Sequence, residues 1–393
     1  MFTIHKTLID NKARLGVLNT LHGMVATPVF MPVGSQATVK ALTPDDLKEI
    51  GASMILSNAY HLYLRPGADL IAQMGGLHKF MRWDDSILTD SGGFQIFSLA
   101  SLCKVTDDGV LFRSHIDGSE HRFTPEFAIE IQEKIGADVI MVLDQCVSHD
   151  APARTVRDAM RRTHEWAVRC RTHHKDNGQL LFAIVQGGLD VEMRRESAAG
   201  LASLDLPGYA IGGLSLGEPK DLTWPIVAET VAALPVAKPR YLMGVGSPED
   251  LIEGVSQGID LFDSVLPTRV ARNGALFTRD GRINIRKAEY ALNLNPIDSD
   301  CGCYTCRTFS AAYLHHLFRS EELLAYRLAT IHNLRFMARL MEDIRDSIKD
   351  DMFPAFKELF LSRYRPVDED LRLEQKKRWR SSSRTRPRSA DSD

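Results

Sequence analysis

The sequence has no apolar run near the roughly 20 residues that a membrane-spanning helix needs. Its first residues, Met1 to Lys6, lack the apolar core of a signal peptide. The net charge is only -3 over 393 residues, so there is no overall attraction to nucleic acids or membranes. Any RNA binding must therefore come from a local basic patch. We expect a cytoplasmic protein with no membrane association.

Cysteine is scarce, with six residues in the whole chain. Three of them stand in one short segment: Cys301, Cys303 and Cys306. In a chain without an export signal, this spacing favours metal binding over disulfides. His332, in a helix predicted from 325 to about 348, is the natural fourth ligand, and we interpret the alternatives His315 and His316 as surface or packing residues. Three thiolates and one imidazole form a closed site typical of structural zinc, so we expect one Zn²⁺ per subunit.

The sequence also lacks a glycine-rich dinucleotide turn after its first barrel-type strand, which argues against a doubly wound open sheet. It has instead eight short apolar runs, most of them separated by helical patterns. The runs are 29–33, 53–57, 86–89, 138–143, 181–185, 209–211, 241–243 and 259–265. A capping box with proline at the first helical position, Thr43 to Asp46, opens one of the intervening helices. Eight strands that alternate with helices predict an α/β fold, a (β/α)₈ TIM barrel. The cysteine segment after it predicts a C-terminal zinc-binding subdomain.

The pattern divides the chain into three parts. Residues 1–290 form the catalytic barrel, preceded by a β-hairpin at the N-terminus. Residues 291–364 form the zinc-binding helical subdomain packed on the barrel. Residues 365–393 are basic and poor in apolar side chains, so we expect a disordered tail there.

Polar residues and glycines follow the apolar runs with unusual regularity. They are Asp90, Asp144, Gln186, Gly213, Gly244 and Asp263. In a barrel these positions converge on the rim formed by the C-terminal ends of the strands, where active sites lie. Two-carboxylate sites cut glycosidic bonds, one acid as nucleophile and the other as proton shuttle.

The segments around these acids indicate what they act on. In the turn after Asp90, Gly92 and Gly93 let a planar ligand approach the backbone. Phe94 and Met243 are candidates to sandwich a flat ring, with ordinary core packing as the alternative. Asp144 and Gln186 are candidates to bond the edge of a purine.

The segment after Asp263 carries two arginines, Arg269 and Arg272. Pro267 is expected to stop any helix, which places both arginines in a loop. There they are candidates to hold phosphates or neighbouring bases, with a surface salt bridge to the acid as the alternative.

Taken together, these residues resemble the queuine tRNA-ribosyltransferase family, also called tRNA-guanine transglycosylases, of the bacterial type. The resemblance runs from about Phe2 to Tyr364. It rests on Asp90-Ser91-Gly92-Gly93-Phe94-Gln95, Gln186-Gly187-Gly188, Gly212-Gly213-Leu214, Met243-Gly244-Val245-Gly246, Phe262-Asp263, Pro267-Thr268-Arg269 and the cysteine cluster with His332.

The resemblance implies exchange of the wobble guanine in tRNAs with a G-U-N anticodon (Asp, Asn, His, Tyr) for a 7-deazaguanine, a step of queuosine biosynthesis. It implies that Asp263 is the nucleophile, through a covalent enzyme–RNA intermediate, and Asp90 the general acid and base. The base pocket implied by it comprises Ser91, Gly92, Gly93, Phe94, Asp144, Gln186, Gly213, Leu214 and Met243. The contacts to the tRNA anticodon loop implied by it are Gly244, Val245, Gly246, Ser247, Pro248, Glu249, Asp250, Thr268, Arg269, Val270, Ala271 and Arg272. It also implies a homodimer.

The inserted base follows from finer similarities. Bacterial members use 7-aminomethyl-7-deazaguanine (preQ1) and eukaryotic members use queuine, which needs more room. Leu216 stands where queuine users have glycine, and Cys146 is similar to bacterial members, whereas Val147-Ser148 is similar to eukaryotic ones. We favour preQ1, with queuine as the alternative. A nucleoside-acting glycosidase and a non-catalytic partner subunit are the other classes considered.

Overall fold

Eight parallel strands form the centre of the molecule in the computed structural model, which describes residues 1–9, 11–99 and 103–366. Their bounds are β4 (Val29–Pro32), β5 (Met54–Asn58), β6 (Ser86–Asp90), β10 (Val139–Met141), β11 (Leu180–Val185), β12 (Gly208–Ile211), β13 (Arg240–Leu242) and β14 (Leu261–Ser264). Each one falls within, or overlaps, one of the eight predicted apolar runs. The tail predicted for 365–393 lies outside the described residues beyond Pro366.

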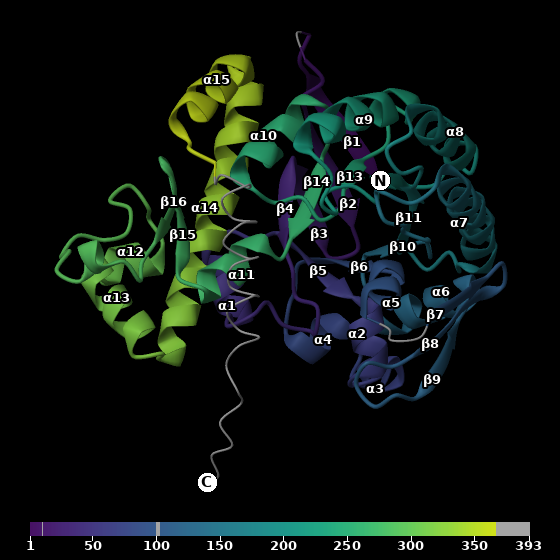
Figure 1. The fold of residues 1–393 in the computed structure, drawn as a ribbon, viewed down its shortest axis with the longest axis horizontal. Coiled ribbons are helices and arrows are strands. Elements are labelled where there is room, and N and C mark those ends of the chain that lie inside the picture. The colour runs from purple at the N-terminus through teal and green to yellow at the C-terminus, as the bar shows by residue number, and fades with distance from the viewer. Residues whose placement is uncertain (10, 100–102, 367–393) are drawn as a thin grey trace.

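The strands pair in chain order, which is the topology of a barrel. The sheet runs β4-β14-β13-β12-β11-β10-β6-β5, and a parallel bridge between Val33 and Leu56 joins its two edges. The amide of Gly34 donates to the carbonyl of Leu56 at 2.6 Å across the same seam. Helices surround the strands (Figure 1). The predicted (β/α)₈ barrel is therefore confirmed.

Among the described residues, eleven helices lie between the strands or directly after them. They are α1 (Pro44–Glu49), α2 (Ala59–Leu64), α3 (Ala68–Gln73), α4 (Leu77–Met81), α5 (Gly93–Leu99), α6 (Pro125–Ile135), α7 (Ala153–His173), α8 (Val191–Ala202), α9 (Lys220–Ala233), α10 (Pro248–Ser256) and α11 (Leu266–Arg272). Side chains cap the start of α1, α2, α6 and α8. Thr43 and Asp46 form the predicted reciprocal capping box of α1. Asn58 caps α2 and thereby fixes the chain where β5 ends.

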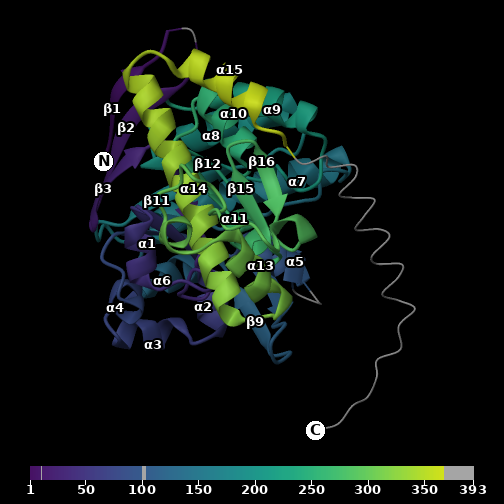
Figure 2. The ribbon, with the colours of Figure 1, turned by 90° about the vertical axis from the view of Figure 1, so that its left-hand side faces the viewer.

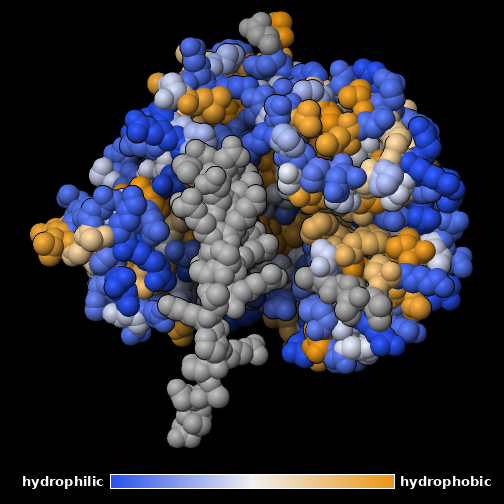
Figure 3. All heavy atoms as spheres, viewed as in Figure 1, coloured by the Kyte–Doolittle hydropathy of each residue, from blue (hydrophilic) through white to orange (hydrophobic). Residues whose placement is uncertain are grey.

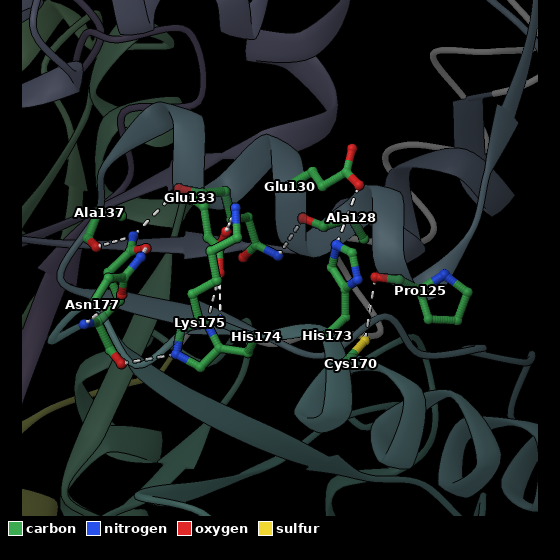
Figure 4. Close-up of polar contacts among 12 residues, drawn as sticks. Pro125, Ala128, Glu130, Glu133, Ala137, Cys170, His173, His174, Lys175 and Asn177 are labelled. Carbon is green, nitrogen blue, oxygen red and sulfur yellow. Dashed lines mark hydrogen bonds and ion pairs between the residues drawn. The ribbon is translucent and has the colours of Figure 1, made fainter.

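Polar contacts fasten α6 to α7 and so hold the base of β10 (Figure 4). Glu133 accepts hydrogen bonds from the His174 ring and the Lys175 amide, and Glu130 lies 3.2 Å from the His173 ring. The thiol of Cys170 donates to the carbonyl of Pro125. Gln179 donates to the carbonyl of Ala137, just before β10, the strand that leads to Asp144.

An antiparallel sheet lies at the N-terminal end of the barrel strands, opposite α5 in Figure 2. Where a hairpin was predicted, the structure has three strands: β1 (Phe2–Thr7), β2 (Arg14–Thr20) and β3 (Gly23–Thr27). The buried guanidinium of Arg14 binds both carboxylate oxygens of Asp260 at the foot of β14. This buried pair joins the small sheet to the barrel.

A second junction lies in the turn between β2 and β3. Asp138 accepts from the amide and the ring of His22, from the ring of His78 and from the amide of Ile87. The two imidazoles stack with centroids 3.5 Å apart, so their in-plane nitrogen lone pairs run side by side and do not converge on one ion. We read this cluster as a hydrogen-bonded clamp at the N-terminal end of the barrel.

A further antiparallel sheet was not predicted: β7 (Cys103–Thr106), β8 (Gly109–Arg113) and β9 (Glu120–Phe123). It follows α5 and packs Phe112 and Phe123 against the aromatic rings of Tyr60 and Tyr63 on α2. Its strands alternate between buried and exposed residues, and they are too short for the pattern to stand out.

The expectation that Pro267 stops a helix was wrong, because α11 begins at Leu266 and continues to Arg272. Proline is tolerated in the first helical turn, where its missing N–H has no partner in any case. Arg269 and Arg272 therefore lie on a helix, not in a loop.

The chain after the barrel forms a helical layer beside it. Its elements are β15 (Ala275–Thr278), β16 (Gly281–Asn284), η1 (Ala288–Tyr290), α12 (Tyr304–Thr308), α13 (Ala311–Arg319), α14 (Leu323–Lys349) and α15 (Phe353–Arg363). The long helix α14 packs against α11, α12, α13, β15 and the barrel strand β4 (Figures 1 and 2). It therefore connects the cysteine segment with the rim of the barrel.

The surface in Figure 3 is mostly hydrophilic, with hydrophobic residues gathered in a few areas. Exposed apolar side chains include Phe94 on α5 and Leu222 on α9. Within the described residues, no helix combines the length and the apolar character needed to cross a membrane.

Candidate active site at the barrel rim

Asp90 lies at the C-terminal end of β6, beside Asn58 at the end of the neighbouring strand. The Asn58 amide donates to Oδ2 of Asp90 at 2.7 Å, while Oδ1 is buried without a hydrogen-bond partner. Burial, reinforced by the negative charge of Asp263, raises the pKa of Asp90 to about 8. At neutral pH this carboxyl is mostly protonated, as a general acid must be.

Asp263 lies at the rim on β14, and its orientation is fixed by two donors. The hydroxyl of Tyr241 and the amide of Gly244 both donate to Oδ1, at 2.6 and 2.7 Å. No hydrogen bond from the described residues reaches Oδ2, which leaves that oxygen available to a ligand. Burial raises the pKa of Asp263 above its usual value, and the two hydrogen bonds oppose that rise. The acid is thus oriented through one oxygen while the other is free to react.

A set of polar groups and glycines continues around the rim from Asp144. Gln186 donates from Nε2 to Oδ2 of Asp144 at 2.7 Å. Burial raises the pKa of Asp144 to about 6, so it is largely ionised at neutral pH. A Cβ on Gly93 would lie 2.7 Å from Oδ1 of Asp144, and one on Gly213 would lie 2.5 Å from Oε1 of Gln186. A Cβ on Gly93 would also lie 2.7 Å from the backbone oxygen of Asp144, which requires glycine there. Gly213 has a φ of +71°, a left-handed conformation that favours glycine.

Other residues predicted for the base pocket lie around this set. Ser91 and Leu214 are buried, and the sulfur of Met243 is 3.6 Å from where a Cβ of Gly212 would stand. Phe94 is 45% exposed on α5, as a side chain awaiting a flat ligand would be. Its stacking role with Met243 stays a prediction.

Some of the residues predicted to contact RNA line a cavity of about 280 Å³ on the same side of the barrel. Residues 244–250, which include the start of α10, and Arg269 form part of its wall, whereas Thr268, Val270, Ala271 and Arg272 do not. Glu249 and Asp250 are ion-paired with Lys220, which adds a cation next to two acids. Within α11, Thr268 and Ala271 are buried, whereas Arg269 is exposed. Arg269 is therefore the exposed residue of this helix, and its contact with RNA stays a prediction.

The predicted metal ligands meet between α12 and α14. One donor atom from each of Cys301, Cys303, Cys306 and His332 lies within 4.8 Å of the others. Nδ1 of His332 is 3.3 Å from the Cys306 sulfur and 3.8 Å from the Cys303 sulfur. Its Nε2–H donates to the carbonyl of Phe277 at 2.7 Å, which leaves Nδ1 for a metal. The cluster can hold a metal ion.

His315, one of the two alternative histidines, lies outside this cluster and bonds the Ile285 carbonyl through its ring. The preference for His332 as the fourth member agrees with the structure.

Several residues of the site were not found from sequence. Asn58 and Tyr241 orient the two acids, and Glu218 accepts from the amides of Ser215 and Leu216. The sequence did carry a signal for Asn58. Asn58 directly follows the apolar run 53–57, as Asp90 directly follows the run 86–89, and the two residues are paired in the sheet. Tyr241 was predicted only as part of the strand 241–243, and no role was predicted for Glu218.

Comparison with known proteins adds an independent finding. The model of the family described as "Queuine tRNA-ribosyltransferase" matches residues 10–366. A protein of that name from Dehalococcoides mccartyi is 63% identical over 378 residues, 96% of each chain. Namesakes from Caldanaerobacter subterraneus and Herpetosiphon aurantiacus are 60% and 57% identical, over 90% and 92% of this chain and 94% and 93% of their own. The chain belongs to the queuine tRNA-ribosyltransferase family.

Proposed function

We propose that this tRNA-ribosyltransferase exchanges the wobble guanine of tRNAs with G-U-N anticodons (Asp, Asn, His, Tyr) for preQ1. The observation that carries this proposal is the pair of carboxyls at the rim. The pKa of Asp90 is raised to about 8, whereas Asp263 is oriented by two donors to one oxygen and keeps its other oxygen free. Two acids with such different environments are suited to opposite roles in breaking a glycosidic bond.

In the first displacement, Oδ2 of Asp263 attacks C1′ of the ribose and the C1′–N9 bond to guanine breaks. The electron pair goes to the base, and Asp90 donates its proton to it. The hydrogen bonds from Tyr241 and Gly244 to Oδ1 hold the nucleophile in line. The products are free guanine and an ester between Asp263 and the ribose.

In the second displacement, N9 of the incoming base attacks C1′ while its proton passes to Asp90. The ester bond breaks and Asp263 leaves as a carboxylate. Two inversions give net retention at C1′. Asp144 and Gln186 accept and donate hydrogen bonds along the edge of the purine in both displacements, because guanine and its 7-deaza analogue share that edge.

The exchange of guanine itself tests this function. Purified protein is incubated with radiolabelled guanine and tRNA-Tyr that lacks the modified base. We expect label to enter the tRNA, and to be lost when the wobble guanine is replaced by adenine. Absence of incorporation by the wild-type chain would contradict the proposed function.

The pH profile of the first displacement follows from the two acids. Asp90 must be protonated and Asp263 ionised, so the rate of adduct formation should fall above about pH 8 and again in acid. The pKa of Asp90 is raised in the folded state, so its ionisation destabilises the fold as pH rises toward 8. Asp90→Asn should thus be inactive at every pH and melt higher than wild type above pH 8. A rate that stays flat through pH 8 would argue against this role.

The choice of base depends on Leu216, which is 38% exposed on the loop after Gly213 and donates its amide to Glu218. We propose that its side chain limits the space for a 7-substituent. Leu216→Ala should raise the kcat/KM for queuine relative to preQ1 by about tenfold, the effect of a few methylenes in a pocket. Leu222→Ala on α9, at a leucine that is 45% exposed, is the control and should leave the ratio unchanged. An unchanged ratio in both variants would show that Leu216 does not select the base.

We further propose that the metal is Zn²⁺, since three thiolates and one imidazole form a closed tetrahedral set. This Zn²⁺ would be structural: it would hold α12 on α14 and take no part in the base exchange. A homodimer and a cytoplasmic location, where tRNA is modified, complete the proposal.

A further inference from the structure

Arg194 on α8 is completely buried behind the glycine loops of the rim. Its Nε donates to the carbonyl of Gly188 at 2.9 Å. Its Nη1 donates to the carbonyls of Val185 and Gly212, at 3.0 and 2.8 Å. The Arg194 guanidinium therefore connects Val185 and Gly188, on either side of Gln186, with Gly212, the residue before Gly213.

This arrangement is unusual for a buried cation, because all three hydrogen bonds go to neutral carbonyls. Burial lowers the pKa of Arg194 to about 10, so it is still charged at neutral pH. Its Nη2 is buried without a hydrogen-bond partner and lies 3.6 Å from where a Cβ of Gly213 would stand. Burying a charge with so few partners costs stability, and a hydrophobic side chain would fill the same space at lower cost.

A buried carboxylate lies on the same loop. Glu218 accepts from the amides of Ser215 and Leu216 and from the hydroxyl of Thr223. Its charge attracts Arg194 without a direct hydrogen bond. At the start of the loop, Arg194 donates to the carbonyl of Gly212. At its end, the carboxylate of Glu218 accepts from the amides of Ser215 and Leu216. The peptide groups of Gly213 and Leu214 between these anchors are left for a ligand.

We propose that Arg194 is a positioning residue for the purine base: its guanidinium sets the orientation of Gln186 and of the Gly213–Leu214 backbone that line the base pocket. This inference rests on the proposed function, since the base is the ligand being positioned. Arg194 touches no reacting atom. Its loss should weaken recognition of the base, both free and as the wobble guanine of the tRNA, and leave the other contacts to the anticodon loop intact.

The chain offers a matched control in Arg240, at the opposite end of the barrel. Arg240 is 5% exposed, bonds the carbonyl of Gly258, has an unpartnered Nε, and burial lowers its pKa to about 10 as well. It stands at the start of β13, where no base-pocket residue lies. Replacing either arginine by lysine keeps a cationic side chain and removes the planar guanidinium, which bonds three carbonyls at Arg194 and one at Arg240.

The test compares wild type, Arg194→Lys and Arg240→Lys by thermal melting and by steady-state guanine exchange with separate KM values for guanine and tRNA. We expect both variants to melt lower than wild type. Arg194→Lys alone should raise the KM for guanine about tenfold or more, since small displacements of positioning groups have effects of this size. The KM for tRNA should rise less, because tRNA keeps its contacts outside the base pocket.

Two results would overturn the inference. One is that Arg194→Lys melts lower with the same KM for guanine as Arg240→Lys, which is the behaviour of a purely structural residue. The other is that Arg194→Lys does not fold while Arg240→Lys does, which would make the guanidinium a requirement of the fold itself. Failure of the proposed function is recognised separately, because the wild-type chain would then exchange no guanine.

Discussion

Asp263→Asn is expected to abolish guanine exchange, with a loss on the order of 10⁴-fold or more, as found when nucleophiles are removed from covalent catalysts. The amide has nearly the shape of the carboxylate and can still accept from Tyr241 and Gly244 through its oxygen. It has no charged oxygen to attack C1′. The measurement is incorporation of labelled guanine into tRNA over a long time course. The melting temperature is measured in parallel to show that the variant folds.

The control for this variant is Tyr241→Phe. It removes one of the two hydrogen bonds to Oδ1 and keeps the carboxylate. Loss of one hydrogen bond to a charged group costs about 1.5–3 kcal/mol, so exchange should slow by roughly one to two orders of magnitude and persist. If Asp263→Asn retained as much activity as Tyr241→Phe, Asp263 would not be the nucleophile.

Removal of the metal is expected to have the largest effect on stability. Structural zinc sites contribute apparent binding free energies of about 10–16 kcal/mol, comparable with the whole stability of a domain. The cluster joins α12 to α14, and α14 packs against α11, which carries Arg269. Cys306→Ala, or incubation with a strong chelator, should therefore lower the melting temperature sharply and weaken tRNA binding as α11 loosens. Metal content by atomic absorption should fall from one per chain to near zero.

Cys103→Ser is the matched control for the metal site. Cys103 is a half-buried free thiol on β7, outside the cluster. This variant should keep its metal and melt near the wild-type temperature. If Cys306→Ala without metal melted like Cys103→Ser, the cluster would not be stabilising the fold.

The barrel could be predicted from sequence because each of its strands is buried on both faces. Such strands form short continuous apolar runs, and the polar residue that follows each run marks the rim. Asp90, Asp144 and Gln186 were found in this way. The metal cluster was equally visible, since three of its ligands are close in sequence and the fourth follows on a recognisable helix.

What the sequence did not show depends on contacts between distant segments. The helix α11 was missed because Pro267 was taken as a stop, although the first turn tolerates it. The burial of Arg194 was missed because an arginine in a helix at the surface of a barrel normally faces solvent. Its burial follows only from the meeting of α8 with the ends of β11 and β12.

The covalent intermediate tests the account most directly. Wild-type protein is mixed with tRNA-Tyr in the absence of free base, denatured, separated by electrophoresis and digested for mass spectrometry. We expect a stable protein–tRNA adduct whose linkage maps to the peptide containing Asp263, and which disappears when guanine or preQ1 is added before denaturation. An adduct on Asp90, or active exchange with no adduct at all, would contradict the double displacement.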